Sequence, residues 1–568
     1  MEKARAQLWL STVMNTQKTN ILLPTSQVRG IDSTGGLGEV PVGLGNELLK
    51  RGDIDLRLAD YYSMRGSLEE RFPDAKLIMP ALAVRYGDRD VAVDIFQIFV
   101  SRPPGSPPLV CYFFRCAEIF ERTDANTGKI NKDTPDKVIL FCSAVMEFIR
   151  TFDGFKPHVV HCNDWQTSLV PVYIKTLYKD DPAFKGMATL YTTHNAGDGF
   201  QGSFSDPTYW LEQAGLDRAG VFESGKTLSL EHHGRINLTK GGIAFADLVN
   251  TVSITYRAEL LTRAFAGGLH GVFLARGSDF DGIVNGIDDG EWNPAADKVL
   301  LPMKFSAKDS ITIIQQEKRH VRSLLREWIV PPGYPTSGTR PFVGLRDNSI
   351  MIAVVSRIDR QKVPILYRAL SEIMSHRDVQ LCILGDAHPN DALGRNYADK
   401  LDELAKWSGG SVLFWRGYDE PLSHLLYASS EVFIVASGFE PCGLTQLIAM
   451  RYGSIPIVRS TGGLRDTVID EADPNQSATA TGFLFKEEVL DDEMFEGSMS
   501  PDGLYTVAKA SKGLIDAVHR ALRIYRDRPE RWRALIKNGM LRDSSWGAPS
   551  LRYLHLYQEA FRRARLRS

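Results

Sequence analysis

The amino-acid sequence predicts an α/β protein built from two Rossmann-like halves. Apolar runs alternate with amphipathic segments along the chain, and the runs outnumber the strands of one doubly wound sheet. A stretch rich in Pro, Gly and polar residues precedes a fresh apolar run at Ile350. Short buried strands that alternate with helices form parallel sheets covered on both faces. The length of 568 residues exceeds one ordinary domain and agrees with two large ones.

The expected elements follow from the spacing of apolar residues. The first half opens with an apolar run at Asn20–Leu23 and with leucines at helical spacing in Gly43–Lys50. Later runs bounded by polar or turn residues are typical of buried parallel strands; they lie at His158–His161, Ala188–Thr192, Leu248–Val252, Ile350–Val355, Gln380–Leu384, Val432–Val435 and Ile455–Val458. Amphipathic helices are expected at Asp136–Thr151, Pro364–Ser375 and Tyr397–Lys406.

Composition excludes several classes of protein. The chain has 67 basic and 69 acidic residues, so no overall charge attracts nucleic acid or an anionic membrane. Six scattered cysteines without CxxC spacing exclude a disulfide scaffold and a zinc site. His232 and His233 are adjacent, and adjacent side chains are expected to point apart, so no metal site is expected there. The N-terminal apolar run is too short for a signal peptide or a membrane span.

One pentapeptide, STGGL, occurs twice, at Ser33–Leu37 and at Ser460–Leu464. Adjacent glycines lack Cβ atoms, so their N–H groups can approach a phosphate or a sugar closely. The spacing differs from the GxGxxG of dinucleotide-binding loops. A structural turn is the alternative for the first copy, and a chance match in a Gly-rich chain is the alternative for the repeat.

Two further motifs place charged side chains beyond strands of the second half. In VSRIDRQK, the planar guanidinium of Arg357 and the mobile ammonium of Lys362 suit a diphosphate. In GFEPCGLTQ, Glu440 stands at a strand-to-helix turn, where a carboxylate can hold sugar hydroxyls while the first helical N–H groups hold phosphate. A solvated basic loop and a helix-capping glutamate are the respective alternatives.

Together these motifs resemble the bacterial glycogen synthase and plant starch synthase family. The resemblance is collinear from about Ile21 to Phe485, and NGID…WNP followed by FEPCGLTQ is its most specific part. It also includes TGGLGEV, HCNDWQT, THN, KGGIAFAD, TVSITY, VSRIDRQK and TGGLRDTV. The family implies a retaining glucosyltransferase of the GT-B fold, in which two Rossmann-like domains face each other across a deep cleft.

The best domain boundary lies between Trp292 and Ser349, where IVPPGYPTSGTRPFVGLRDN is rich in Pro and Gly. With the resemblance, we expect an acceptor-side domain over residues 1–291 and a nucleotide-sugar donor side over residues 292–542. A C-terminal helical segment over residues 543–568 is expected to pack back on the first domain.

On the donor side, the resemblance implies that Arg357 and Lys362 bind the diphosphate and that the catalytic Glu440 contacts the donor glucose. Tyr418, in RGYDE, matches the aromatic residue that stacks on the nucleotide base, with a buried loop tyrosine as the alternative. The other expected donor-binding residues are Gly35, Gly36, Cys442, Gly443, Leu444 and Thr445.

On the acceptor side, the resemblance implies that His194, within THN, lies near the reacting glucose as the second catalytic residue. Asp164, Asn195 and Glu39 match acceptor-binding positions. Trp165 offers either a sugar-stacking face or core packing. The implied partners are a nucleotide sugar, ADP-glucose or UDP-glucose, and an α-glucan acceptor, glycogen or starch; no metal or other cofactor is expected.

The chain departs from the family pattern at several positions. The family lysine that contributes to donor binding is replaced by Ser33, and Arg29, four residues earlier, is a candidate substitute. Glu39 replaces the usual aspartate, the loop AGDGFQG after THN is lengthened, and Val363–Pro364 replaces a glycine. These changes indicate a divergent member with altered donor or acceptor preference.

The expected function is transfer of glucose from a nucleotide-diphosphate glucose, with ADP-glucose favoured, to the non-reducing end of an α-1,4-glucan with retention. A catalytically weak glucan-binding or regulatory relative is the first alternative. Another GT-B sugar-nucleotide transferase or an epimerase is the second. The expected location is the cytoplasm, or the plastid stroma if a transit peptide has been removed, with neither nucleic acid nor membrane as a partner. The sequence does not indicate an oligomeric state.

Overall fold

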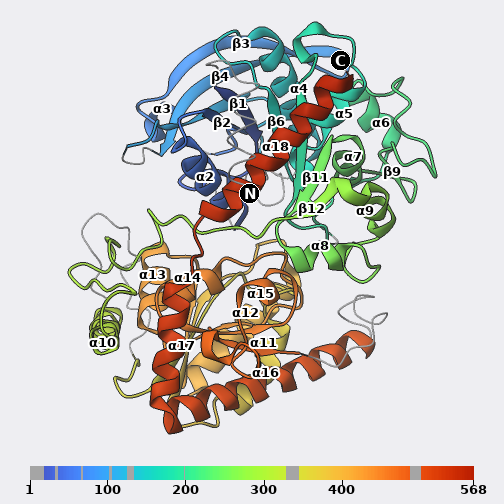
Figure 1. The fold of residues 1–568 in the computed structure, drawn as a ribbon. Coiled ribbons are helices and arrows are strands. Elements are labelled where there is room, and N and C mark those ends of the chain that lie inside the picture. Colours follow the sequence, from blue (N-terminus) through green and yellow to red (C-terminus); the bar gives the residue numbers. More distant parts are fainter. Residues whose placement is uncertain are drawn as a thin grey trace. The chain divides into compact units, whose positions relative to one another are not determined.

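The computed structural model describes residues 18–31, 36–64, 68–101, 105–123, 134–197, 199–327, 344–486 and 501–567. These residues form two compact units (Figure 1). The first unit contains the chain up to Val252, then Arg257–Gly286, then the chain from Trp546 onward. The second contains Ser253–Tyr256 and Ile287–Ser545.

The first unit is built on a nine-stranded sheet within the described ranges, in the order β12-β11-β7-β6-β1-β2-β5-β4-β3. Its strands are β1 (Thr19–Pro24), β2 (Ile54–Tyr61), β3 (Lys76–Tyr86), β4 (Arg89–Ser101), β5 (Leu109–Arg115), β6 (Val159–Asn163), β7 (Ala188–Thr193), β11 (Leu248–Thr251) and β12 (Phe280–Gly282). Neighbours pair in parallel from β12 to β5, whereas β3, β4 and β5 pair antiparallel.

Helices and a small sheet complete this unit. The α-helices are α2 (Gly36–Leu49), α3 (Leu68–Arg71), α4 (Pro135–Thr151), α5 (Leu169–Lys175), α6 (Pro207–Gln213), α7 (Leu238–Phe245), α8 (Ile254–Leu260, which begins in the second unit), α9 (His270–Arg276) and α18 (Gly547–Arg567). Short 3₁₀ turns lie at Trp165–Thr167, Pro182–Phe184 and Gly277–Asp279. The small sheet has the order β8 (Ser203–Phe204), β10 (Arg235–Asn237), β9 (Glu231–His232).

The last helix, α18, is tied into the core of the first unit. The Tyr557 hydroxyl lies 2.9 Å from Nδ1 of His161 in β6, and Asn250 of β11 donates to the Tyr553 hydroxyl at 3.2 Å. His161 and Asn250 are themselves joined through Thr192 of β7. All these groups are buried, so the hydrogen bonds satisfy polar atoms that would otherwise be costly to bury.

The second unit contains a six-stranded parallel sheet in its described part, in the order β15-β14-β13-β16-β17-β18. The strands are β13 (Ile350–Val355), β14 (Val379–Gly385), β15 (Val412–Arg416), β16 (Val432–Val435), β17 (Ile455–Arg459) and β18 (Phe483–Phe485). The helices are α10 (Ile311–Glu327), α11 (Pro364–Ile373), α12 (Ala392–Trp407), α13 (Glu420–Ser429), α14 (Thr445–Arg451), α15 (Gly462–Thr467), α16 (Pro501–Asp527) and α17 (Pro529–Leu541), with a 3₁₀ turn at Ser477–Thr479.

The expected buried strands and amphipathic helices are all present, with ends shifted by a few residues. The antiparallel edge β3-β4-β5 was not among them, because its strands alternate apolar and polar residues rather than forming continuous apolar runs. The units divide after Gly286 rather than at residue 291, because the Ile287 N–H donates to the carbonyl of Ser544 at 2.8 Å and joins the two connecting segments.

The six cysteines are buried and unpaired in disulfides. Within the described residues, no helix combines the length and the apolar character needed to cross a bilayer.

We predict that Gly43→Ala destabilises the first unit. A Cβ at Gly43 would lie 2.1 Å from Nε1 of the buried Trp546, just before α18, so one of these packed elements must shift. The expected loss is about 1–3 kcal/mol of unfolding free energy, measured by thermal and urea denaturation. Gly271→Ala is the matched control, because Gly271 is exposed in α9 and its Cβ would meet nothing within 4 Å. That control should be stabilising by about 0.5–1 kcal/mol.

Candidate functional site

In the first unit, two expected site residues follow neighbouring parallel strands. Asp164 comes directly after β6 and His194 directly after β7. Because parallel neighbours end at the same sheet edge, the two residues meet: the His194 N–H donates to Oδ1 of Asp164 at 2.6 Å. Asp164 has φ 55° and ψ −179°, a strained conformation for a residue with a Cβ. Such strain is common where a side chain must be held in place for function.

The imidazole of His194 is neutral near pH 7. Burial lowers the pKa of His194 to about 3. Nε2 lies 2.8 Å from Oδ1 of Asn163, and the Asn163 amide NH₂ donates to the carbonyls of Pro24 and His161. Since Oδ1 of Asn163 must then accept, Nε2 of His194 carries the hydrogen. Nδ1 is left with a lone pair that can accept a hydrogen bond from a hydroxyl.

Asn195 and Trp165 lie beside these residues in the chain, and the structure separates their roles. The side chain of Asn195 accepts from the Gly197 N–H at 2.9 Å, so it shapes the start of the lengthened loop. Trp165 is buried, and a Cβ at Gly202 would lie 2.4 Å from its ring. Of the two interpretations of Trp165, the structure supports core packing.

The start of α2 holds Gly36 and Glu39. Glu39, in the first turn, pairs with Arg29 at 2.9 Å, and both side chains are largely buried. Arg29 is therefore already engaged by a carboxylate, which argues against its replacing the family lysine. Ser33 and Gly35 lie outside the described residues.

In the second unit, Lys362 and Glu440 form an ion pair through Nζ and Oε2. Two loops are joined to make it: the Gly438 N–H donates to the carbonyl of Gln361 at 2.7 Å, and the Gln361 amide donates to the carbonyl of Phe439 at 2.8 Å. The Ser437 hydroxyl also donates to Oε2 of Glu440 at 2.7 Å. The carboxylate is therefore fixed and sits next to a cation.

The second STGGL copy packs against the Glu440 turn. A Cβ at Gly462 would lie 1.9 Å from the carbonyl oxygen of Glu440, and one at Gly463 would lie 2.2 Å from that of Cys442. Gly462 also has φ 43°, which disfavours other residues. Close backbone approach explains why both positions are glycine.

The other donor-side residues surround this turn. Gly443 has φ 72° and Thr445 begins α14, whose first turn receives no capping hydrogen bond from a side chain. Such a helix start offers N–H groups to an anion. The remaining expected residues in this turn, Cys442 and Leu444, are buried and half-buried.

The two remaining donor-side residues lie after strands of the same sheet. Arg357 follows β13, is about half exposed, and approaches Asp359 at 3.4 Å. Tyr418 follows β15 with 74% of its surface exposed, so the interpretation of a buried loop tyrosine is wrong.

Sequence reasoning missed the residues that orient this chemistry and misjudged one pair. Asn163 and Ser437 position His194 and Glu440, and their only sequence signal is a place beside a motif. His232 and His233 were expected to point apart, yet their ring centroids lie 4.2 Å apart. The reason is the turn between β9 and β10, where His233 takes a left-handed conformation with φ 52°.

Comparison with known proteins identifies the family. Residues 20–275 match the family described as "Starch synthase catalytic domain", and residues 338–499 match "Glycosyl transferases group 1". Glycogen synthase 2 of Geobacter sulfurreducens is 34% identical over 548 residues, which cover 95% of this chain and 98% of that protein. The glycogen synthase of Thermotoga maritima is 33% identical over 533 residues, 93% of this chain and 96% of that protein. The chain belongs to the glycogen and starch synthase family.

A solved structure agrees with this membership. The catalytic domain of starch synthase IV from Arabidopsis thaliana, bound to ADP and acarbose, matches with a TM-score of 0.76 and 29% identity. The match covers 96% of this chain and 100% of that chain. The two Rossmann-like units are those of the GT-B fold, so the predicted fold class and the predicted family are confirmed. A member of this family is a hexosyltransferase.

We predict that His194→Gln flattens the dependence of stability on pH. An unfolded histidine has a pKa of about 6.5 and folded His194 one of about 3. Between these values the unfolded chain binds the extra proton, so unfolding free energy falls as the pH falls. From pH 6.5 to 5 this costs about 2 kcal/mol for one group. The variant should lose about that much less in urea titrations at the two pH values.

His555→Gln, at an exposed position on α18, is the matched control and should keep the wild-type slope. An equal slope in His194→Gln and wild type would show that His194 is protonated in the folded protein.

Proposed function

We propose that this chain transfers glucose from a nucleotide-diphosphate glucose to the non-reducing end of an α-1,4-glucan, with retention at the anomeric carbon. The second unit binds the donor and the first binds the acceptor. One observation carries the proposal: the Lys362–Glu440 pair stands beside the uncapped start of α14. A fixed carboxylate, a cation and helical N–H groups are together suited to a sugar joined to a diphosphate.

The donor side follows from the chemistry of each group. Arg357 offers a planar fork and Lys362 a point charge for diphosphate oxygens. The amides at Gly443 and Thr445 add donors for the same oxygens. Lys362 exchanges part of its contact with Glu440 for the phosphate, which leaves Glu440 Oε1 and Oε2 to accept from the glucose hydroxyls. Tyr418 supplies an exposed ring on which either nucleotide base can stack.

ADP-glucose is the favoured donor. The starch synthase IV structure that this chain resembles contains ADP. No side chain of the described donor side distinguishes the edges of adenine and uracil on the contacts above, so the preference rests on that neighbour alone.

The reaction needs little more than charge placement. A nucleoside diphosphate is already a good leaving group, so the protein must stabilise the negative charge that grows on it. Arg357 and Lys362 supply this, while Glu440 lies where it can offset positive charge on the sugar ring. Attack from the same face as departure lets the leaving phosphate take the proton of the acceptor hydroxyl, and retention follows.

On the acceptor side, neutral His194 presents Nδ1 as a hydrogen-bond acceptor, and a depressed pKa keeps it in that form. A neutral imidazole orients a glucose hydroxyl without repelling the positive charge of the developing transition state. Asp164 and Asn195 flank His194 and offer carboxylate and amide groups to further sugar hydroxyls.

A catalytically weak, glucan-binding relative is the second candidate. It is favoured by one observation, the Arg29–Glu39 ion pair, because the nearby arginine is occupied where the family lysine is absent.

A panel assay tests the function and separates the two candidates. Purified protein, glycogen and a set of nucleotide sugars are scored for nucleotide release and chain growth, and we expect turnover with ADP-glucose above UDP-glucose. Glu440→Gln keeps the shape and an oxygen for Lys362 but removes the charge, so transfer should fall by about a hundredfold or more. Glu403→Gln, an exposed position on α12, is the control. Wild-type turnover in Glu440→Gln would refute the assignment of Glu440.

Ser33→Lys should strengthen donor binding. A restored charge-assisted contact contributes on the order of 1.5–3 kcal/mol, which corresponds to a donor KM lower by about tenfold to a hundredfold. Ser33→Gln, which adds length without charge, is the matched control and should leave KM near the wild-type value. An unchanged KM in Ser33→Lys would mean that the pocket has been rebuilt around serine.

A further inference from the structure

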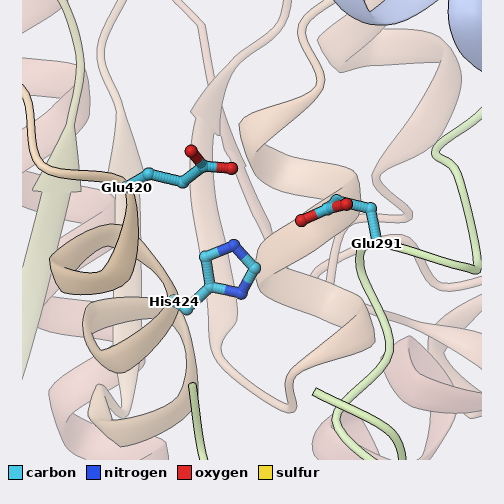
Figure 2. Close-up of side chains that lie close together, drawn as sticks. All are labelled: Glu291, Glu420 and His424. Atoms are coloured by element: carbon cyan, nitrogen blue, oxygen red, sulfur yellow. The ribbon is translucent and has the colours of Figure 1, made fainter. Parts of the chain in front are cut away.

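We propose that Glu291, Glu420 and His424 form a binding site for a divalent transition-metal ion in the second unit. One ligand atom from each residue lies within 4.8 Å of the others. Glu420 and His424 are four residues apart on α13 and therefore share a face of that helix. Glu291 comes from the segment just before Trp292. In Figure 2 both carboxylates and the far nitrogen of the imidazole ring point toward a common space.

His424 is held as a metal ligand would be. Its side chain is 2% exposed, and Trp292 stacks on the ring with centroids 4.3 Å apart and planes at 19°. Nδ1 lies 2.7 Å from Oδ2 of Asp297. A carboxylate that binds one imidazole nitrogen and thereby aims the other at the ion is the usual support of histidine ligands.

The support fixes the tautomer of His424. Asp297 is buried, which alone would raise its pKa, but hydrogen bonds from His424, from the Tyr452 hydroxyl at 2.6 Å and from the Val299 N–H at 2.8 Å lower the pKa below its usual value. An ionised Asp297 accepts from Nδ1–H, so Nε2 of His424 keeps its lone pair. Among the described residues, none forms a hydrogen bond with this Nε2.

The ligand set selects the class of ion. One imidazole nitrogen with two carboxylate oxygens suits Zn²⁺ and its neighbours such as Co²⁺ and Mn²⁺, whereas Mg²⁺ and Ca²⁺ prefer oxygen alone. Two carboxylates also balance the charge of a dication. Bonds of about 2.0–2.2 Å require the three groups to draw closer. Glu420 is exposed and can rotate to do so.

Such an ion would join two distant segments of the chain. Glu420 is the first residue of α13, two positions after Tyr418, and Glu291 belongs to the segment that enters the second unit. Binding would therefore hold the start of α13 against that segment, and the binding measurement needs neither donor nor acceptor.

The experiment uses the full chain after removal of metals with EDTA. Zn²⁺ titration calorimetry should find one tight site per chain, and Co²⁺ should give visible absorption bands that Zn²⁺ abolishes. Glu420→Gln should weaken Zn²⁺ by tenfold or more, because loss even of an outer support of a metal ligand costs ten- to a hundredfold. Glu403→Gln, exposed on α12, should bind as wild type does. Zn²⁺ should raise Tm in wild type and in Glu403→Gln but not in Glu420→Gln.

The neighbouring rings of His232 and His233 are the competing source of Zn²⁺ binding in the first unit. His233→Asn removes one of them, and asparagine tolerates the left-handed backbone there. Zn²⁺ binding that survives this variant supports the proposal. Binding lost in His233→Asn but kept in Glu420→Gln, or no stoichiometric binding by wild type, would overturn it.

Discussion

Both units depend on one constraint, that parallel strands of a sheet all end at the same edge. In the first unit this brings Asp164 and His194 together after β6 and β7. In the second it gathers Arg357, the Glu440 turn and Gly462 after β13, β16 and β17. The sheets bury apolar strands on both faces, so their edges are the places where polar side chains can collect without a desolvation cost.

Within the second unit, the chemistry depends on how closely backbones approach. Gly462 and Gly463 lie against the carbonyls of Glu440 and Cys442, and Gln361 is joined to the same turn by two hydrogen bonds. Three loops from different strands are thereby held as one body. The Lys362–Glu440 pair is a result of this packing, because each partner is on a loop that the others position.

The sequence predicts the elements and the motifs well but not the contacts between them. Continuous apolar runs identify the central strands, and FEPCGLTQ identifies Glu440, since both are local patterns. The pairing of Lys362 with Glu440 and the support of His194 by Asn163 depend on tertiary structure. For the same reason the grouping of Glu291 with α13 has no sequence signal, because its members are far apart in the chain. The paired rings of His232 and His233 follow from one backbone angle that no periodicity encodes.

The position of α18 has a consequence for synthesis on the ribosome. His161 and Asn250, in strands made early, find hydroxyl partners only on Tyr557 and Tyr553, which are translated last. The N-terminal part of the nascent chain must therefore wait, with polar groups and the apolar surface around Gly43 still open, while the whole second unit is made. Folding of the second unit can be completed first, and the chain is sealed by its final helix. The order of folding is thus the reverse of the order expected when N-terminal domains fold first.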